Sequence, residues 1–189
     1  MLEENPAVDP DLSRARATLE AYAPRDEEQA RFRTDLIAWI DEHPEDAHRR
    51  SCLEGHLTAS VLLVDHTRER VLLHHHRKLD RWLQFGGHCD GDANLRGVAY
   101  RELVEESGIR PAWLSEEPVD LDIHKIPARP GEPEHDHLDV RYLAVAPTGA
   151  TPELSEESKA LRWFTVEEAA RLDLDPSLRR LMPLAFESA

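Results

Sequence analysis

The feature that most constrains this chain is a set of three glutamates at helical spacing. Glu102, Glu105 and Glu106 stand at positions i, i+3 and i+4, so on a helix their carboxylates share one face. Like charges in this arrangement repel each other by a few tenths of a kcal/mol per pair, unless a cation is shared. Hard divalent cations such as Mg²⁺ and Mn²⁺ prefer clustered carboxylate oxygens. The segment therefore predicts either a metal-binding helix or a solvated acidic face.

Apolar segments of strand length lie on both sides of this helix. Strands are expected at 56–65, 70–76, 81–85, 119–126, 138–146 and 161–164. The glutamate helix is expected over 94–107, with Gly108 as its C-terminal stop. The pair Gly86-Gly87 is expected to form a turn that ends the third strand. This mixture of strands and helices indicates an α/β fold built around one sheet.

Helices are also expected at both ends of the chain. Apolar residues recur at helical spacing through residues 9–43, and Pro24 divides that stretch into two helices. Near the other end, Thr165 and Glu168 have the spacing of a capping box, and Pro176 is expected to begin a last helix. We therefore expect a helical hairpin, a sheet and a C-terminal helix, in that order.

The change of pattern near residue 50 predicts two segments. Residues 1–50 form a helical N-terminal extension, and residues 51–189 form the main domain. The extension could pack on the main domain or on a second subunit, in which case the protein would be a homodimer. The sequence leaves both arrangements open.

Residues 87–109 resemble the Nudix box, whose pattern is Gly, five residues, Glu, seven residues and then Arg-Glu-aliphatic-x-Glu-Glu-x-Gly-aliphatic. The positions that match at this spacing are Gly87, Arg101, Glu102, Leu103, Glu105, Glu106, Gly108 and Ile109. The order of the expected strands agrees with this family over about residues 55–175. The resemblance implies a Nudix-like α/β/α sandwich with a mixed β-sheet, here with an N-terminal helical extension.

The resemblance also implies a chemistry for these residues. In Nudix enzymes the glutamates that match Glu102, Glu105 and Glu106 hold Mg²⁺ or Mn²⁺, and the backbone carbonyl at the position of Gly86 often completes the site. Independently of the resemblance, Arg101 stands one turn before Glu105 and could orient it by a charge-assisted hydrogen bond. The expected reaction is metal-dependent hydrolysis of a diphosphate linkage in a nucleoside diphosphate derivative or a similar small molecule.

One position departs from the family pattern. The first glutamate of the box would fall at Ala93, and the nearest acidic residues are Asp90 and Asp92. We expect one of these aspartates to replace the missing glutamate by bonding Arg101. If Asp92 does so, Asp92→Ala should lower activity, whereas Ala93→Glu should change little.

Residues outside the box provide further candidates. Glu157 lies where some members of the family place a distal base or metal ligand, although it could equally belong to an ordinary acidic loop. The stretch 66–81 carries five basic residues against two acidic ones. From this stretch Arg77, Lys78 and Arg81 are candidates for binding substrate phosphates.

Histidines form a second group of candidates. His137, with His135 and His124, could contact substrate, or the three could form a metal or phosphate cluster on neighbouring strand ends. His88 lies beside Cys89, a pairing that would also suit zinc. Short acidic loops with histidines are often simply solvated, so the sequence leaves these alternatives open.

The overall charge excludes some functions. Asp and Glu number 38 against 23 Lys and Arg, which gives a net charge of −15. Such a chain is poorly suited to nucleic-acid polymers or anionic membranes. No apolar run has the length of a membrane span and no signal peptide is visible, so we expect a cytoplasmic protein with reduced cysteines. A small anionic substrate remains compatible, because divalent metals reverse the charge locally.

Two other functions fit the same fold. Isopentenyl-diphosphate isomerase carries a Gly-His pair similar to Gly87-His88, with its histidine as a metal ligand. In that enzyme a cysteine precedes the histidine, whereas here Cys89 follows it. A non-catalytic regulator that senses a nucleotide is the other alternative, and the departure at Ala93 keeps it open. The complete Arg-Glu-x-x-Glu-Glu core favours a hydrolase over both.

Overall fold

The structure, a computed structural model, describes residues 8–186. Its strands are β1 (Gly55–Val64), β2 (Arg70–His76), β3 (Arg81–Leu83), β4 (Phe85–His88), β5 (Trp113–Leu114), β6 (Asp120–Ile126), β7 (His135–Val145) and β8 (Ser158–Thr165). Its helices are α1 (Leu12–Ala21), α2 (Glu27–Glu42), α3 (Leu95–Ser107), α4 (Val166–Ala169) and α5 (Pro176–Phe186). The outermost residues of the expected segments 1–50 and 51–189 lie outside the described range.

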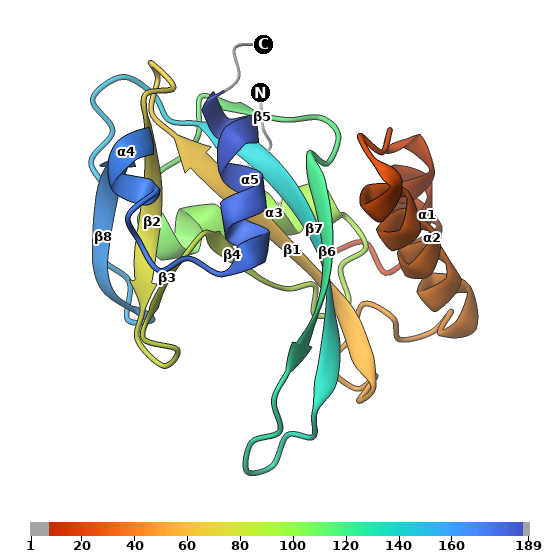
Figure 1. Cartoon of the computed structure of the whole chain (residues 1–189). Helices are drawn as coiled ribbons and strands as arrows, with labels where there is room; N and C mark the ends of the chain where they lie inside the picture. Colours follow the sequence, from red (N-terminus) through yellow and green to blue (C-terminus); the bar gives the residue numbers. More distant parts are fainter. Residues whose placement is uncertain (1–7, 187–189) are drawn as a thin grey trace.

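All eight strands belong to one mixed sheet. β1 pairs in parallel with β7 along its whole length, from Gly55 opposite Asp136 to Val64 opposite Val145. The other pairings are antiparallel, with β2 and β4 on β1, β3 and β8 on β2, and β5 and β6 on β7. Helix α3 covers one face and α5 the other (Figure 1). The expected α/β/α sandwich with a mixed sheet is therefore confirmed.

The central strand β1 separates two apolar cores. All ten of its residues are buried, as is typical of a strand covered on both faces. Leu57 and Val61 belong to the core on the α3 side, and Leu62 and Val64 to the core on the α5 side. Side chains that alternate along β1 therefore point to opposite faces, which places every neighbouring strand residue on one side or the other.

The two N-terminal helices are anchored to the main sheet. Buried residues of α1 and α2, such as Leu19 and Leu36, belong to the same core as α3. The side chain of Gln29 binds the backbone of Leu121 on β6, donating to its carbonyl at 3.0 Å and accepting from its N–H at 2.8 Å. The amide of α2 thus pairs with the outer edge of β6, beside which the helices lie (Figure 1).

Several expected elements have different bounds. The strand expected over 81–85 is divided into β3 and β4, and Gly86-Gly87 lies within β4 rather than in a turn. β7 begins at His135, three residues before the expected start, so the acidic histidine segment is strand rather than loop. The short β5 was not expected at all. Among residues 8–186, no helix is both long enough and apolar enough to span a bilayer.

Candidate active site

Helix α3, which carries the three glutamates, is capped at both ends. Asn94 caps its first turn by accepting a hydrogen bond from the N–H of Gly97 at 3.2 Å. Gly108 ends it in the left-handed conformation, with φ at 70°, which favours glycine. Both ends agree with the expected helix to within one residue. The caps therefore fix both ends of the helix that carries the glutamates.

The glycine pair of β4 brings the backbone against this helix. A Cβ at Gly87 would lie 2.5 Å from Oε2 of Glu102, and a Cβ at Gly86 would lie 2.4 Å from Cβ of Ser60. The two glycines thus allow close approach on opposite faces of the sheet. The N–H of Gly86 donates to Oε2 of Glu106 at 2.9 Å. The predicted site residues Gly86, Glu102 and Glu106 therefore meet at β4.

Two of the three carboxylates hold their protons unusually strongly. Burial raises the pKa of Glu102 to about 7, and repulsion by Glu105 adds to the effect. Burial also raises the pKa of Glu106 to about 8, with further repulsion from Glu102. The hydrogen bond from Gly86 acts in the opposite direction but does not prevail. A shared cation would stabilise carboxylates that are buried and repel each other in this way.

Two exposed carboxylates add to this negative region. Glu105 lies on the same helix and Glu157 lies just before β8, and each raises the pKa of both Glu102 and Glu106 by repulsion. The structure therefore brings the predicted distal residue Glu157 into electrostatic range of the α3 carboxylates. Carboxylate oxygens are the ligands that Mg²⁺ and Mn²⁺ prefer, so a divalent ion could balance this negative region.

The position of the missing box glutamate is filled by Asp92. Its Oδ2 accepts a hydrogen bond from Nη1 of Arg101 at 3.3 Å, and the residue is 1% exposed. Asp90 instead forms two 2.7 Å hydrogen bonds with Arg50. Of the two expected candidates, Asp92 therefore bonds Arg101. Ala93 is fully buried, so a carboxylate introduced by Ala93→Glu would be forced into the core, and we now expect this substitution to destabilise the fold.

His74 and Ser158 are neighbours of Glu106 that the motif did not identify. Nδ1 of His74 lies 2.9 Å from the Ser158 hydroxyl and 3.7 Å from Oε1 of Glu106. Burial lowers the pKa of His74 to about 4, so its imidazole is neutral at pH 7. His74 belongs to a run of three histidines, His74–His76, whereas Ser158 carries no signal that separates it from other serines.

The basic residues of the 66–81 stretch are not equivalent. The guanidinium of Arg77 donates to the carbonyls of Glu156 and Ser158, at 2.9 Å and 3.0 Å, and so joins the end of β2 to the start of β8. Lys78 and Arg81 are exposed. Their role in binding substrate stays a prediction.

His137 points away from the glutamates. Its neighbour Leu138 belongs to the core on the α3 side, so alternation along β7 places His137 on the other face. There it lies close to His56 and His88. The structure therefore brings these three histidines together on the opposite face of the sheet, away from the carboxylate site.

Comparison with known families identifies this arrangement. A model of the NUDIX domain matches residues 55–185, which is more than half of the chain. The chain belongs to the Nudix family. No functionally curated protein gives a significant sequence match. The matched region begins at β1 and runs into α5, so α1 and α2 precede it.

Solved Nudix structures share this fold. A NUDIX family hydrolase from Clostridium perfringens is 25% identical with a TM-score of 0.50, covering 69% of this chain and 93% of that one. The Escherichia coli dihydroneopterin triphosphate pyrophosphohydrolase is 20% identical, with a TM-score of 0.56 and coverage of 68% and 92%. The NUDIX domain of Shewanella oneidensis NrtR, solved with ADP-ribose, is 19% identical, with a TM-score of 0.56 and coverage of 68% and 84%.

Proposed function

We propose that this Nudix hydrolase cleaves a diphosphate linkage in a nucleoside diphosphate derivative or a similar small molecule, and that it needs a divalent cation. The observation that carries the proposal is the placement of the half-buried Glu102 and the buried Glu106 against the glycine pair of β4, where burial raises their pKa values to about 7 and about 8. Burying several carboxylates without a compensating cation is unfavourable. A bound cation would turn this arrangement into a site for phosphate oxygens.

The donor set fits a hard divalent ion. Glu102, Glu105 and Glu106 would hold Mg²⁺ or Mn²⁺, with the carbonyl of Gly86 as a further oxygen ligand. When bound, the ion would neutralise diphosphate charge and lower the pKa of a water molecule. Protons on the two buried carboxyls compete with the ion, so ion binding should release protons and strengthen as the pH rises.

The other candidate residues have roles that follow from their contacts and exposure. Arg101 of α3 donates to Asp92 and so joins the helix to the loop that precedes the helix. Glu157 is exposed and lies within electrostatic range of the buried pair, so it is the candidate for taking a proton from the attacking water. Lys78 and Arg81 are exposed cations that could bind phosphate oxygens not neutralised by the ion.

We further propose a cytoplasmic location and a small-molecule partner. Cys52 and Cys89 are free and buried, which suits a reducing compartment. Light scattering of the full chain tests whether it forms a homodimer.

The function is tested by a product-mass screen in Mg²⁺ and in Mn²⁺. The substrates are ADP-ribose, nucleoside diphosphate sugars, NADH, dinucleoside polyphosphates and nucleoside triphosphates. We expect one class to be hydrolysed, and Glu105→Gln and Glu106→Gln to lower kcat at least 100-fold. Glu117→Gln, which changes an exposed glutamate outside the site, is the control.

The same screen separates the alternatives. Conversion of isopentenyl diphosphate to dimethylallyl diphosphate, without hydrolysis of any diphosphate, would make the protein an isomerase. Tight binding of a nucleotide without turnover would make it a sensor. Either result contradicts the proposal.

A further inference from the structure

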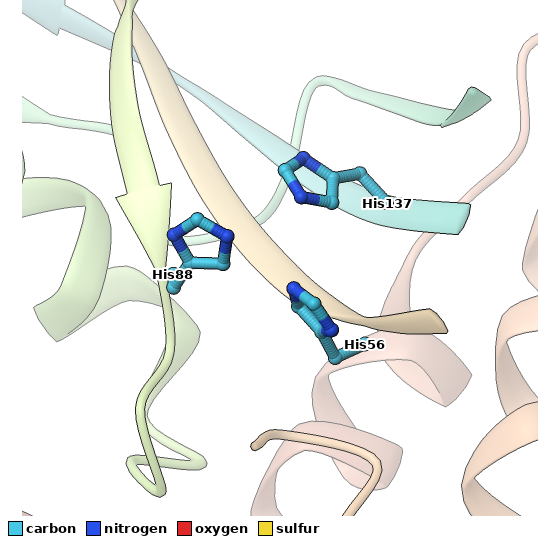
Figure 2. A group of neighbouring side chains, drawn as sticks. All are labelled: His56, His88 and His137. Atoms are coloured by element: carbon cyan, nitrogen blue, oxygen red, sulfur yellow. The ribbon is translucent and has the colours of Figure 1, made fainter. Parts of the chain in front are cut away.

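Three histidines from three different strands converge on the face of the sheet opposite α3. They are His56 at the start of β1, His88 at the end of β4 and His137 near the start of β7 (Figure 2). Each offers one ring nitrogen, and these nitrogens all lie within 4.8 Å of one another. The ring centroids are 4.9 to 5.2 Å apart. This is the spacing of ligands around one small centre.

The strand register accounts for the convergence. His56 lies directly opposite His137 in the parallel pairing of β1 with β7. His88 lies opposite Thr58, two residues further along β1, and therefore on the same face as His56. Gly87, which precedes His88, faces Glu102 on the α3 side. The histidine group is thus separated from the carboxylate site by the sheet itself.

The ring nitrogens of this group lack partners. Nε2 of His56, of His88 and of His137 is buried and makes no hydrogen bond among the described residues. Buried polar atoms are rarely left unpaired, because an unmade hydrogen bond costs stability. A metal ion held between these three histidines would give such nitrogens a partner.

The tautomer of His56 favours a metal. Its Nδ1 lies 3.3 Å from the carbonyl of Cys52, and a carbonyl can only accept, so Nδ1 carries the hydrogen. Nε2 therefore presents a lone pair. Metal-binding histidines commonly donate their second ring N–H to a backbone carbonyl in this way. His135, stacked on His56 with centroids 4.9 Å apart, repeats the pattern with the carbonyl of Pro133 at 2.9 Å.

The surroundings keep these imidazoles in their neutral, metal-binding form. Burial lowers the pKa of His88 to about 4 and of His137 to about 2, and it also lowers the pKa of His56. Arg50, whose charge lowers the pKa of His56 and of His88, is paired with Asp90 by two hydrogen bonds of 2.7 Å. A cation entering the group therefore meets three lone pairs and no uncompensated positive charge from this arginine.

We propose that His56, His88 and His137 form a second metal site, which binds Zn²⁺ or a similar borderline transition ion through three imidazoles. Imidazole suits Zn²⁺, whereas Mg²⁺ prefers oxygen, so the two sites select different ions. Three protein ligands leave the fourth tetrahedral position to water or to an anionic ligand. Zn–N distances of about 2.0–2.1 Å imply nitrogens about 3.4 Å apart, so binding draws the rings slightly closer together.

The site is tested with the metal alone, on the metal-stripped full chain. Titration with Co²⁺ should give one equivalent with the intense visible bands of tetrahedral nitrogen and oxygen coordination, and Zn²⁺ should abolish them. Competition with a chromophoric chelator then gives the Zn²⁺ affinity. His88→Gln and His137→Gln should each weaken it more than about 100-fold, since loss of a mere orienting group costs about 10–100-fold. His66→Gln, an exposed histidine on the turn after β1, is the matched control.

Two other centres provide the contrary outcomes. His43, Asp46 and Cys52 form another group with ligand spacing, so a thiolate-to-cobalt band that disappears in Cys52→Ala would overturn the assignment. Loss of Zn²⁺ binding in Glu106→Gln, with binding intact in His137→Gln, would move the ion to α3. Absence of any stoichiometric Co²⁺ or Zn²⁺ binding by the wild-type chain would also overturn it. The wild-type spectrum decides the ligand type even where a variant fails to fold.

Discussion

At the scale of single residues, the absence of side chains at Gly86 and Gly87 shapes the active site. A methyl group at Gly87 would meet only the end of the flexible Glu102 side chain, whereas one at Gly86 would meet Ser60 at both Cβ and Cα. The first conflict can be relieved by moving a carboxylate, and the second only by moving a strand. The two adjacent glycines therefore make room for different groups, Gly87 for a carboxylate of the candidate site and Gly86 for the neighbouring strand.

This contrast gives the first prediction. Gly87→Ala should displace the Glu102 carboxylate, lowering the Mn²⁺ affinity and kcat at least tenfold while the melting temperature changes little. Gly86→Ala should lower the melting temperature markedly, because the strand β4 must shift. Differential scanning fluorimetry and Mn²⁺ titration measure both effects. Equal losses of stability in the two variants would contradict this division of roles.

Asp92 carries the second prediction. Besides Arg101, it accepts hydrogen bonds from the N–H of Asp9 at 3.1 Å and of Asn94 at 3.0 Å. Asp92→Ala leaves these groups without their acceptor, so it should destabilise the fold by about 2–4 kcal/mol and lower kcat. Asp92→Asn retains an acceptor oxygen and should recover much of the stability but less of the activity. Urea unfolding and steady-state kinetics distinguish the two losses.

The third prediction concerns pH in the metal-free protein. The pKa of Glu106 is raised from 4.5 to about 8 on folding, so the folded state binds more protons than the unfolded state between these values. The free energy of unfolding should therefore fall as the pH rises through this range, by up to about 1.4 kcal/mol per pH unit. Glu106→Gln should remove this component, and Glu117→Gln should retain it. Urea unfolding at pH 5 and pH 8 in chelator measures it; parallel profiles for the wild type and Glu106→Gln would refute it.

At the scale of elements, the N-terminal hairpin acts as a partner for the sheet. Gln29 is fully buried, and its amide binds both backbone groups of Leu121 and accepts from the Tyr22 hydroxyl at 2.7 Å. One side chain of α2 thus occupies the edge of β6 where another strand would otherwise pair. A hairpin attached in this way is part of the folding unit.

The fourth prediction follows from this attachment. Gln29→Ala should destabilise the protein by about 2–4 kcal/mol, because the N–H of Leu121 and the buried hydroxyl of Tyr22 lose their acceptor, whereas the Leu121 carbonyl keeps a hydrogen bond from Arg180 at 3.1 Å. Tyr22→Phe, which removes one hydrogen bond and leaves the amide in place, should cost only about 0.5–1.5 kcal/mol. Chemical denaturation of both variants tests the comparison. Similar small losses would show that water replaces the amide at this edge.

The elements also show what a sequence can predict. Apolar periodicity and the stop signal at Gly108 are local, so the sequence predicts the helix α3 to within one residue. Whether a Gly-Gly pair forms a turn or allows two elements to approach depends on Ser60 and Glu102, which are distant in the sequence. The carboxylate site can be predicted from its motif. The side on which each histidine lies depends on strand register, which no local pattern supplies.

At the scale of the whole molecule, the two faces of the sheet carry different polar systems. The α3 face has an excess of carboxylates that a cation would balance. On the α5 face Arg141 lies almost fully buried among Asp120, Asp122 and Asp139, to which it donates at 2.8 to 3.4 Å. Arg141 also donates to Ser177 of α5, so one side chain joins β6, β7 and the covering helix. The net charge of −15 is therefore balanced unevenly. The buried carboxylates of the α5 face are paired with arginine, whereas those of the α3 face would need an added cation.

The fifth prediction removes this balance. Arg141→Met should cost about 3–5 kcal/mol and lower the melting temperature by about 6–20 °C, because it leaves the buried Asp139 without its cation. Asp120 and Asp122 keep their ion pairs with Arg180. Adding Asp139→Asn should recover part of the loss, since one uncompensated charge disappears. The deficit of Arg141→Met should also shrink as the pH falls below the ordinary pKa of aspartate, because a protonated carboxyl needs no cation. Thermal unfolding of both variants at pH 7 and pH 3 measures each effect. A deficit that is independent of pH and unrelieved by Asp139→Asn would mean that Arg141 stabilises the fold by packing rather than by charge.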